Sequence, residues 1–185
     1  MIVENTIRAV VLCPGPSVVR FNGPLCDDVT TFYNIAIAVN RAAGAFGCDW
    51  WVCLDARSFA ACEPMGTPKI VCSQNQYRLM CAKWPQAAKH KHKKHWPGKI
   101  PTSKCKWNHF GSTVAIELAF RLGAVEIDAY GVDWDGKADF DGYTDTNQVR
   151  NADRWRREAE IFGALAEEIS RRGGRVRRIE PVYSS

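Results

Sequence analysis

The chain has 185 residues, of which 46% are hydrophobic, and a formal net charge of +5. This length suits one domain with a sizeable core and is short for two, so we expect a single domain over residues 1–185. No apolar run approaches the roughly 20 residues that span a membrane. The first residues also lack the basic and apolar regions of a signal peptide, so we expect a cytoplasmic protein.

Short apolar segments alternate with helical patterns along the chain. This alternation predicts an α/β fold of the Rossmann-like class, with a mostly parallel sheet and helices on both faces. The predicted strands are residues 7–13, 34–40, 49–55, 69–73, 125–131 and 175–179. The predicted helices are residues 41–46, 56–62, 76–83, 112–122 and 152–172, the last of which should end at Gly173.

The first predicted strand runs into the turn Pro14-Gly15-Pro16-Ser17. In a parallel sheet, ligands bind beyond the carboxyl ends of the strands, where this turn lies. Proline fixes the backbone and glycine admits conformations closed to other residues, so the turn can hold its amides and the Ser17 hydroxyl toward a ligand. A tight turn without any ligand explains the same residues equally well.

The eight cysteines of the chain do not form a pattern typical of disulfide or zinc sites. Cys13, Cys53 and Cys72 lie in apolar strand-like segments, and we interpret the cysteines mainly as small buried hydrophobic residues of a reducing compartment. The sequence contains no Cys-x-x-Cys pair, which argues against a structural zinc ion.

Positive charge is concentrated in the middle of the chain, where residues 64–116 contain ten Lys or Arg and no acidic residue. We predict a basic loop insertion at about residues 85–107, with lysines from Lys89 to Lys106 and interleaved tryptophans. The segment suits a nucleic-acid surface or a loop over an anionic ligand, although a solvated loop explains such a charge run most simply. A metal site is disfavoured by the flanking lysines and the missing carboxylates; its histidines would be His90, His92 and His95.

Other predicted strand ends also carry polar residues. Asn40 ends the second strand and Asp55 the third. Gly111-Ser112 opens the 112–122 helix, where Ser112 suits the N-cap and the positive end of the helix suits an anion, although simple capping explains the serine as well.

The strand at residues 125–131 leads into an acidic turn that contains Gly131, Asp133 and Asp135. Carboxylates at this position suit a sugar hydroxyl, a base edge or a divalent cation. The spacing of Asp133 and Asp135 is that of the metal-binding motif of many glycosyltransferases, but acid-rich turns after strands are common. We therefore expect no obligatory cofactor, with a divalent cation at these two residues as the lesser alternative.

Taken together, these segments resemble the bacterial sialyltransferases that use CMP-sialic acid. The chain is also similar to a wider group of Rossmann-like proteins, many of them phage-encoded, with the same Gly-Pro-Ser turn. The resemblance implies a glycosyltransferase-like enzyme that binds a nucleotide sugar, with CMP as a candidate nucleotide, and transfers the sugar to an acceptor. The matching residues are Gly15-Pro16-Ser17, Asn40, Gly111-Ser112, Leu122-Gly123-Ala124 and Tyr130-Gly131-Val132-Asp133.

The resemblance and the strand-end positions together nominate the site. Two departures from the family matter: Pro14 stands where the family has asparagine, and residues 135–157 contain no counterpart of its catalytic histidine. The remaining catalytic candidates are Asp133 and His109. The candidate substrate-binding residues are Gly15, Pro16, Ser17, Asn40, Asp55, Gly111, Ser112, Gly131 and Asp135.

The alternative is a catalytically inactive, phage-type protein of the same fold. It would bind nucleic acid or a protein partner through the basic segment at residues 85–107. Binding to nucleic acid would weaken steeply with salt, whereas nucleotide-sugar binding would depend on the strand-end loops.

Overall fold

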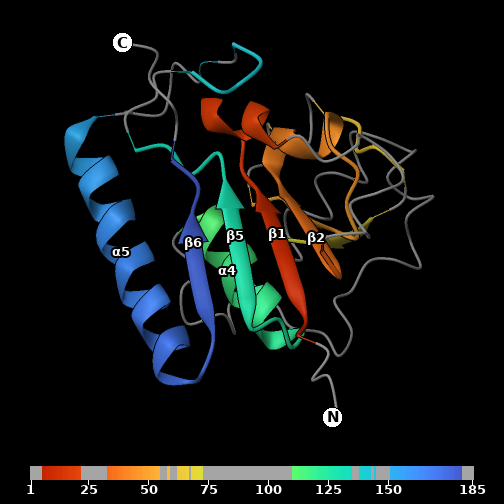
Figure 1. The fold of residues 1–185 in the computed structure, drawn as a ribbon. Coiled ribbons are helices and arrows are strands. Elements are labelled where there is room, and N and C mark those ends of the chain that lie inside the picture. Colours follow the sequence, from red (N-terminus) through yellow and green to blue (C-terminus); the bar gives the residue numbers. More distant parts are fainter. Residues whose placement is uncertain are drawn as a thin grey trace.

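The computed structural model describes residues 6–21, 33–54, 58, 62–66, 68–72, 110–134, 138–142, 144 and 151–180. Within these residues, six parallel strands form one sheet in the order β4-β3-β2-β1-β5-β6 (Figure 1). The predicted α/β class and the six predicted strands are thereby confirmed. The strands are β1 (Arg8–Leu12), β2 (Ile35–Val39), β3 (Trp50–Val52), β4 (Lys69–Val71), β5 (Glu126–Tyr130) and β6 (Arg175–Arg178).

Four helical elements accompany the sheet in the described part of the chain. Two are α-helices, α4 (Gly111–Arg121) and α5 (Ala152–Arg171), and two are 3-10 helices, η1 (Pro16–Arg20) and η2 (Asn40–Gly44). Among the described residues, no helix has both the length and the apolarity needed to cross a membrane.

The central strand β1 is buried on both faces, and its residues from Ala9 to Leu12 are fully buried. This is the pattern of an inner strand in a parallel sheet, which explains its continuous apolar sequence. The two edge strands differ from it. β4 has only three residues, and β6 carries arginines at three of its four positions, features that discourage pairing with another sheet.

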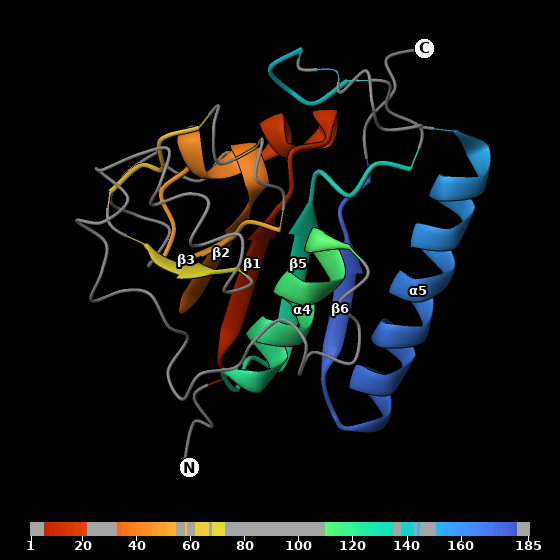
Figure 2. The same cartoon turned by 180° about the vertical axis from the view of Figure 1, so that it is seen from behind.

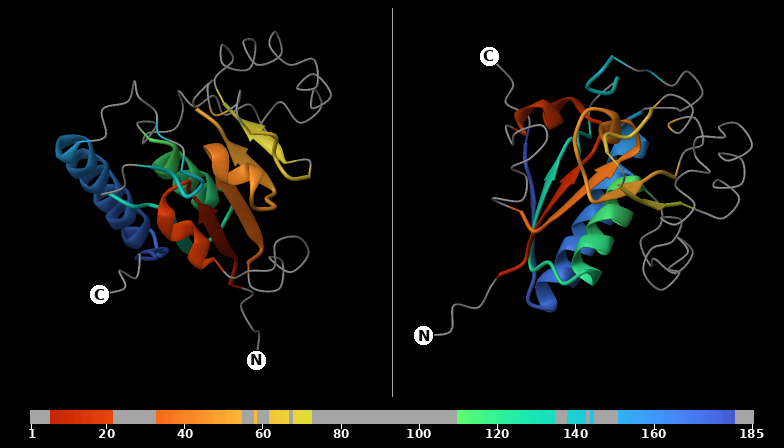
Figure 3. Two further views of the ribbon diagram at one scale, coloured as in Figure 1. Left: turned by 90° about the horizontal axis from the view of Figure 1, so that it is seen from above. Right: turned by 90° about the vertical axis from the view of Figure 1, so that its right-hand side faces the viewer.

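The strand order reverses at β1, because β2, β3 and β4 are added on one side and β5 and β6 on the other. Since crossovers between parallel strands are right-handed, connections on the two sides of β1 should lie on opposite faces. The two hydrophobic clusters agree with this rule. Residues of α4 and α5 pack on the face that carries Val11, and residues of η1 and η2 on the face that carries Leu12. Figures 2 and 3 show α4 and α5 on the same side of the sheet.

Several predicted helices differ in detail from the structure. The helix predicted at residues 41–46 is the shorter 3-10 helix η2, and η1 was not predicted because two prolines frame its start. Gly173 follows α5 with φ +84°, as predicted. The predicted helix at residues 76–83 and most of that at 56–62 lie outside the described residues.

The prediction that Ser112 caps its helix was wrong. Phe110 is the N-cap of α4, and Ser112 is the second residue of the helix. The first turn is closed by the Val114 backbone N, which donates to the Phe110 carbonyl oxygen at 3.1 Å, and the Thr113 hydroxyl donates to the same oxygen at 3.0 Å. The Ser112 hydroxyl points to another helix, as described below.

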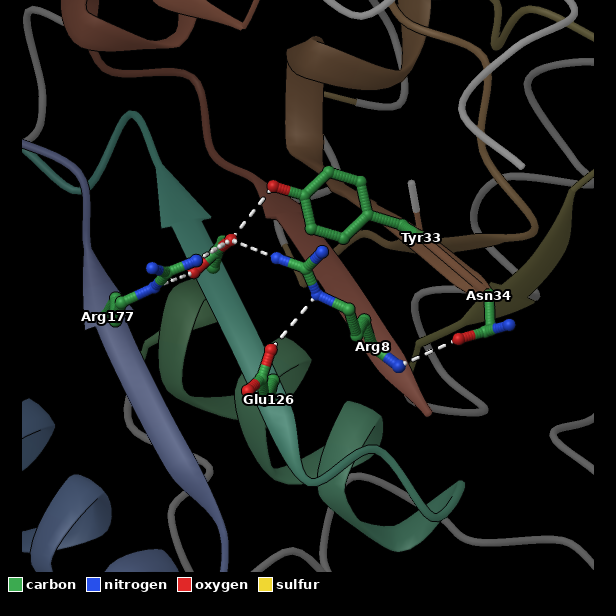
Figure 4. Close-up of polar contacts among 6 residues, drawn as sticks. Arg8, Tyr33, Asn34, Glu126 and Arg177 are labelled. Carbon is green, nitrogen blue, oxygen red and sulfur yellow. Dashed lines mark hydrogen bonds and ion pairs between the residues drawn. The ribbon is translucent and has the colours of Figure 1, made fainter. Parts of the chain in front are cut away.

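The face of β5 and β6 away from α5 carries charged residues, because no described α-helix covers it. Asp128 is only 5% exposed and accepts two 2.6 Å hydrogen bonds from Arg177. The Tyr33 hydroxyl also donates to it at 2.9 Å. Arg8 lies 3.9 Å from Asp128 and 3.0 Å from Glu126 (Figure 4). On this face of β5 and β6, paired charges thus take the place of apolar packing.

We expect Asp128→Ala to lower the free energy of unfolding by about 2–4 kcal/mol, because it strips a buried carboxylate from Arg177 and Tyr33. Arg177 is 42% exposed and can be rehydrated, which keeps the loss below that of a fully buried pair. Urea denaturation measures the change. The matched control is Glu126→Ala on the same strand and face, which is 44% exposed and should cost less than about 1 kcal/mol. Equal losses in the two variants would contradict this account.

Candidate functional site

The turns after β1 and β5 lie in direct contact where the strand order reverses. The backbone N and the Oγ of Ser17 donate to the two carboxylate oxygens of Asp133, each at 2.6 Å. Ser17 Oγ in turn accepts from the Gly131 backbone N at 3.0 Å. The Gly15 N donates to the Gly131 carbonyl oxygen at 3.0 Å. We call Gly15, Ser17, Gly131 and Asp133 the loop clamp.

The two glycines of the loop clamp permit this close approach. Gly131 has φ +70°, and a Cβ on it would overlap the Cys13 backbone. A Cβ on Gly15 would collide with the Gly131 carbonyl and would lie 2.7 Å from Asp133 Oδ2. Glycine is therefore needed at both positions for the turns to meet.

Within the loop clamp, the candidate residues Ser17 and Asp133 bind each other. The structure brings Ser17 and Asp133 together, but their side chains contact each other and are only 3% and 8% exposed as residues. Their polar atoms are therefore used to join two loops. Such buried polar groups rigidify a site, so these residues shape the edge of the sheet at which a ligand would bind.

Asn40 lies at the carboxyl end of β2, where it begins η2. With φ +48°, it is the one non-glycine residue with a positive φ among the described residues. Its carbonyl oxygen accepts a 2.8 Å hydrogen bond from the Trp51 indole Nε1. Its side-chain Oδ1 is buried and accepts no hydrogen bond in the part of the chain that the structure describes. A buried acceptor without a partner costs about 1–3 kcal/mol, so a donor from a ligand would stabilise this position.

Helix α4 begins directly beside Asn40. A Cβ on Gly111 would lie 2.6 Å from Val39 Cγ1 and 3.9 Å from Asn40 Nδ2. Glycine at this position therefore lets the helix approach the end of β2. The structure thus places two of the predicted substrate-binding residues, Asn40 and Gly111, side by side.

The positive end of α4 is met by a carboxylate of the protein itself. The first turn of α4 contains no acidic residue and its N-cap makes no side-chain hydrogen bond. Ser112 is buried, and its hydroxyl donates to Glu158 Oε1 at 2.8 Å. Because negative charge stabilises a helix N-terminus, Glu158 supplies from α5 the charge that α4 lacks. The carboxylate of Glu158 therefore lies near the start of α4, where the sequence predicted an anion.

Glu158 is not among the site residues predicted from the sequence. It is only 9% exposed and belongs to the buried stripe of α5. The other buried members follow at helical spacing, at Phe162, Leu165 and Ile169. Extending that spacing back by one turn reaches Glu158, which is the signal that could have found it.

Cys13 ends β1 close to both buried carboxylates. Burial raises the pKa of its thiol well above the usual value, and the charges of Glu158 and Asp133 raise it further. The two carboxylates therefore act on the same strand end, and the Cys13 thiol stays protonated at neutral pH.

The segment at residues 138–142 lies against the turn after β1. The Phe140 N donates to the Pro14 carbonyl oxygen at 2.8 Å, and Arg41 forms an ion pair with Asp141. No group of three or more metal-ligating side chains occurs among the described residues. Three candidates, Asp55, His109 and Asp135, lie outside those residues, as does the basic segment at residues 85–107.

Comparison with known proteins gives one distant structural likeness. No protein-family model and no curated protein matches the sequence. Among solved structures, the chain is similar to the sialyltransferase CstII from Campylobacter jejuni in complex with the substrate analogue CMP-3FNeuAc. The identity is 14% and the TM-score 0.46, over 94% of this chain and 81% of that one. At this level the likeness says nothing about substrate or activity.

We expect Ser17→Ala to lower the free energy of unfolding by about 1–3 kcal/mol, because Asp133 and the Gly131 amide both lose a buried partner. Chemical denaturation measures the loss. Ser170→Ala, at an exposed position of α5, is the control and should change stability by less than about 0.5 kcal/mol. A Ser17→Ala variant as stable as this control would show that the loop clamp contributes little.

Native Cys13 and Cys48 should react slowly with iodoacetamide at pH 8. Burial raises the pKa of both thiols, that of Cys48 to about 12, so the reactive thiolate forms only at much higher pH than in the unfolded chain. Mass spectrometry of labelled peptides, native against urea-unfolded, measures the protection of each cysteine. Equal labelling in the two states would contradict the burial.

Proposed function

We propose that the protein binds a nucleotide sugar at the carboxyl ends of β1 and β2 and transfers the sugar to an acceptor hydroxyl. The observation that carries the proposal is the buried Oδ1 of Asn40, which has no hydrogen-bond partner among the described residues, on a side chain that lies beside the first residue of α4. Parallel α/β sheets bind their ligands at this edge, and buried polar atoms of proteins normally have partners. A ligand that donates a hydrogen bond to Asn40 would lie at this edge and would give the buried oxygen a partner.

The ligand would lie over β1 and β2 rather than between β1 and β5. The loop clamp joins the turns after β1 and β5 by direct hydrogen bonds. Asn40, in contrast, lies between the turn after β1 and the start of α4, where its amide could bind a ligand. Asn40 is accordingly proposed to contact the nucleotide, whereas Ser17 and Asp133 hold the turn in place.

The chemistry of Asn40 fits the base or sugar of a nucleotide. Its amide accepts and donates hydrogen bonds, and the exocyclic amine of cytosine is a donor that matches the unpartnered oxygen. We therefore propose CMP as the nucleotide part of the nucleotide sugar. Arg154, whose guanidinium lies 5.9 Å from the ring centre of Phe110 just before α4, is proposed to stabilise the phosphate of the departing nucleotide.

The transfer breaks the bond between the anomeric carbon and the phosphate oxygen and forms one to the acceptor oxygen, whose proton passes to a base. Both oxygens of Asp133 accept hydrogen bonds from Ser17, so we assign Asp133 the role of orienting the turn after β1 and not that of the base. Of the two catalytic candidates, His109 is then the proposed base, because imidazole accepts protons near neutral pH.

Asn40→Gly tests the proposal, because it removes the amide while glycine accepts the positive φ without strain. We expect CMP and CMP-sugars to raise the melting temperature of the wild type. The variant should bind them about tenfold more weakly, the loss for one hydrogen bond, as measured by isothermal titration calorimetry.

The control for this experiment is Asn34→Gly at the opposite end of β2, where Asn34 accepts a hydrogen bond from the Arg8 backbone N. It should bind CMP as the wild type does. The proposal fails if no nucleotide or nucleotide sugar stabilises the wild type, or if Asn40→Gly binds with unchanged affinity. Binding of nucleic acid that weakens steeply with salt would then favour the non-catalytic alternative.

A further inference from the structure

The strand β3 carries two adjacent tryptophans that point to opposite faces of the sheet. Trp50 belongs to the hydrophobic cluster on the side of α4 and α5, and Trp51 to the cluster on the side of η1 and η2. Both are almost completely buried, at 4% and 2% exposure. The two side chains therefore have similar size and burial, but only Trp51 is seen to hydrogen-bond with Asn40.

The hydrogen bond between Trp51 and Asn40 acts on an unusual backbone. A positive φ is unfavourable for a residue with a Cβ, although asparagine tolerates it better than most. The Trp51 Nε1 lies 2.8 Å from the Asn40 carbonyl oxygen and thereby fixes the direction of that carbonyl. The thiol of Cys62 lies 3.6 Å from the next carbonyl oxygen, that of Arg41. Asn40 is thus held from the β3 side while its side chain lies beside α4.

The register of the sheet makes room for this contact. Trp51 lies opposite Ala38 on β2, two residues before Asn40 and on the same face. The side chain of Ala38 is small, and β2 ends one residue after it. The large indole of Trp51 can therefore reach past Ala38 to the Asn40 carbonyl oxygen. A buried indole N–H needs an acceptor, and here the acceptor is the backbone of Asn40, the residue whose buried Oδ1 has no partner among the described residues.

We propose that Trp51 is a positioning residue of the site. Its indole N–H holds Asn40 in the left-handed conformation and so places the Asn40 amide beside the first turn of α4. This inference rests on the proposed function in one respect, namely that Asn40 contacts the nucleotide. Without the indole N–H, Asn40 would spend part of its time in other backbone conformations, and ligand affinity falls in proportion to the competent fraction.

The test compares Trp51→Phe with Trp50→Phe, a matched control that removes an indole from the same strand on the other face. Both variants are studied at a temperature at which circular dichroism shows them folded. We expect Trp51→Phe to weaken CMP binding about fivefold to tenfold through the loss of competent Asn40 conformers. In the control, CMP affinity should equal that of the wild type. Equal affinities of the two variants would overturn the positioning role.

A double-variant cycle separates positioning from a general loss of packing. In the Asn40→Gly background there is no side-chain amide to place, so Trp51→Phe should cause no further loss of CMP affinity. If Trp51→Phe weakens binding equally in both backgrounds, Trp51 acts through packing and the inference is wrong.

A conformational readout keeps this inference separate from the proposed function. The Cα and Cβ chemical shifts of Asn40 report its backbone conformation without any ligand. They should move away from left-handed values in Trp51→Phe and stay unchanged in Trp50→Phe; unchanged shifts in both variants would refute the inference. If the wild type binds no CMP, the proposed function fails, but these shifts still test Trp51. Should Trp51→Phe not fold, the isosteric benzothienyl analogue at position 51 removes the N–H while keeping the shape.

Discussion

The carboxylate of Asp133 and the two hydrogen bonds that it accepts from Ser17 determine the shape of the carboxyl edge of the sheet. In a doubly wound sheet the loops on the two sides of the reversal point diverge and commonly leave a crevice. Here the turns after β1 and β5 are joined directly, and Gly15 and Gly131 make that approach possible. A carboxylate with so little exposure is stable only with such partners. The ligand position that we propose therefore lies beside β2 and α4.

A second buried carboxylate, that of Glu158, links the two α-helices at the same edge. It interacts with Ser112 at the positive end of α4, and its charge also acts on the Cys13 thiol at the end of β1. The helix end is therefore already stabilised by a negative charge of the chain. Asn40 differs from these groups, because its buried side-chain oxygen has no partner within the described residues. This contrast distinguishes the proposed ligand contact from the residues that support it.

The topology explains where charge is tolerated elsewhere. Right-handed crossovers put α4 and α5 on one face of the sheet and leave the other face of β5 and β6 without a described α-helix. That face consequently carries Asp128, which is paired with Arg177 and Tyr33 rather than packed under apolar residues. Arg177 of β6 forms this ion pair, and the three arginines of β6 together discourage pairing at an edge strand.

The six strands could be predicted from the sequence, because buried strands of a parallel sheet need continuous apolar runs. The end of α5 could be predicted as well, because a glycine is favoured at φ +84°. The sequence also placed Gly15, Asn40 and Gly131 at strand ends. Which polar groups contact one another could be seen only in the folded structure. Ser17 and Asp133 are 116 residues apart, and Ser112 and Glu158 are 46 apart. Such partners depend on strand order and helix packing, about which a local pattern carries no information, so the sequence indicated a cap at Ser112 and no role for Glu158.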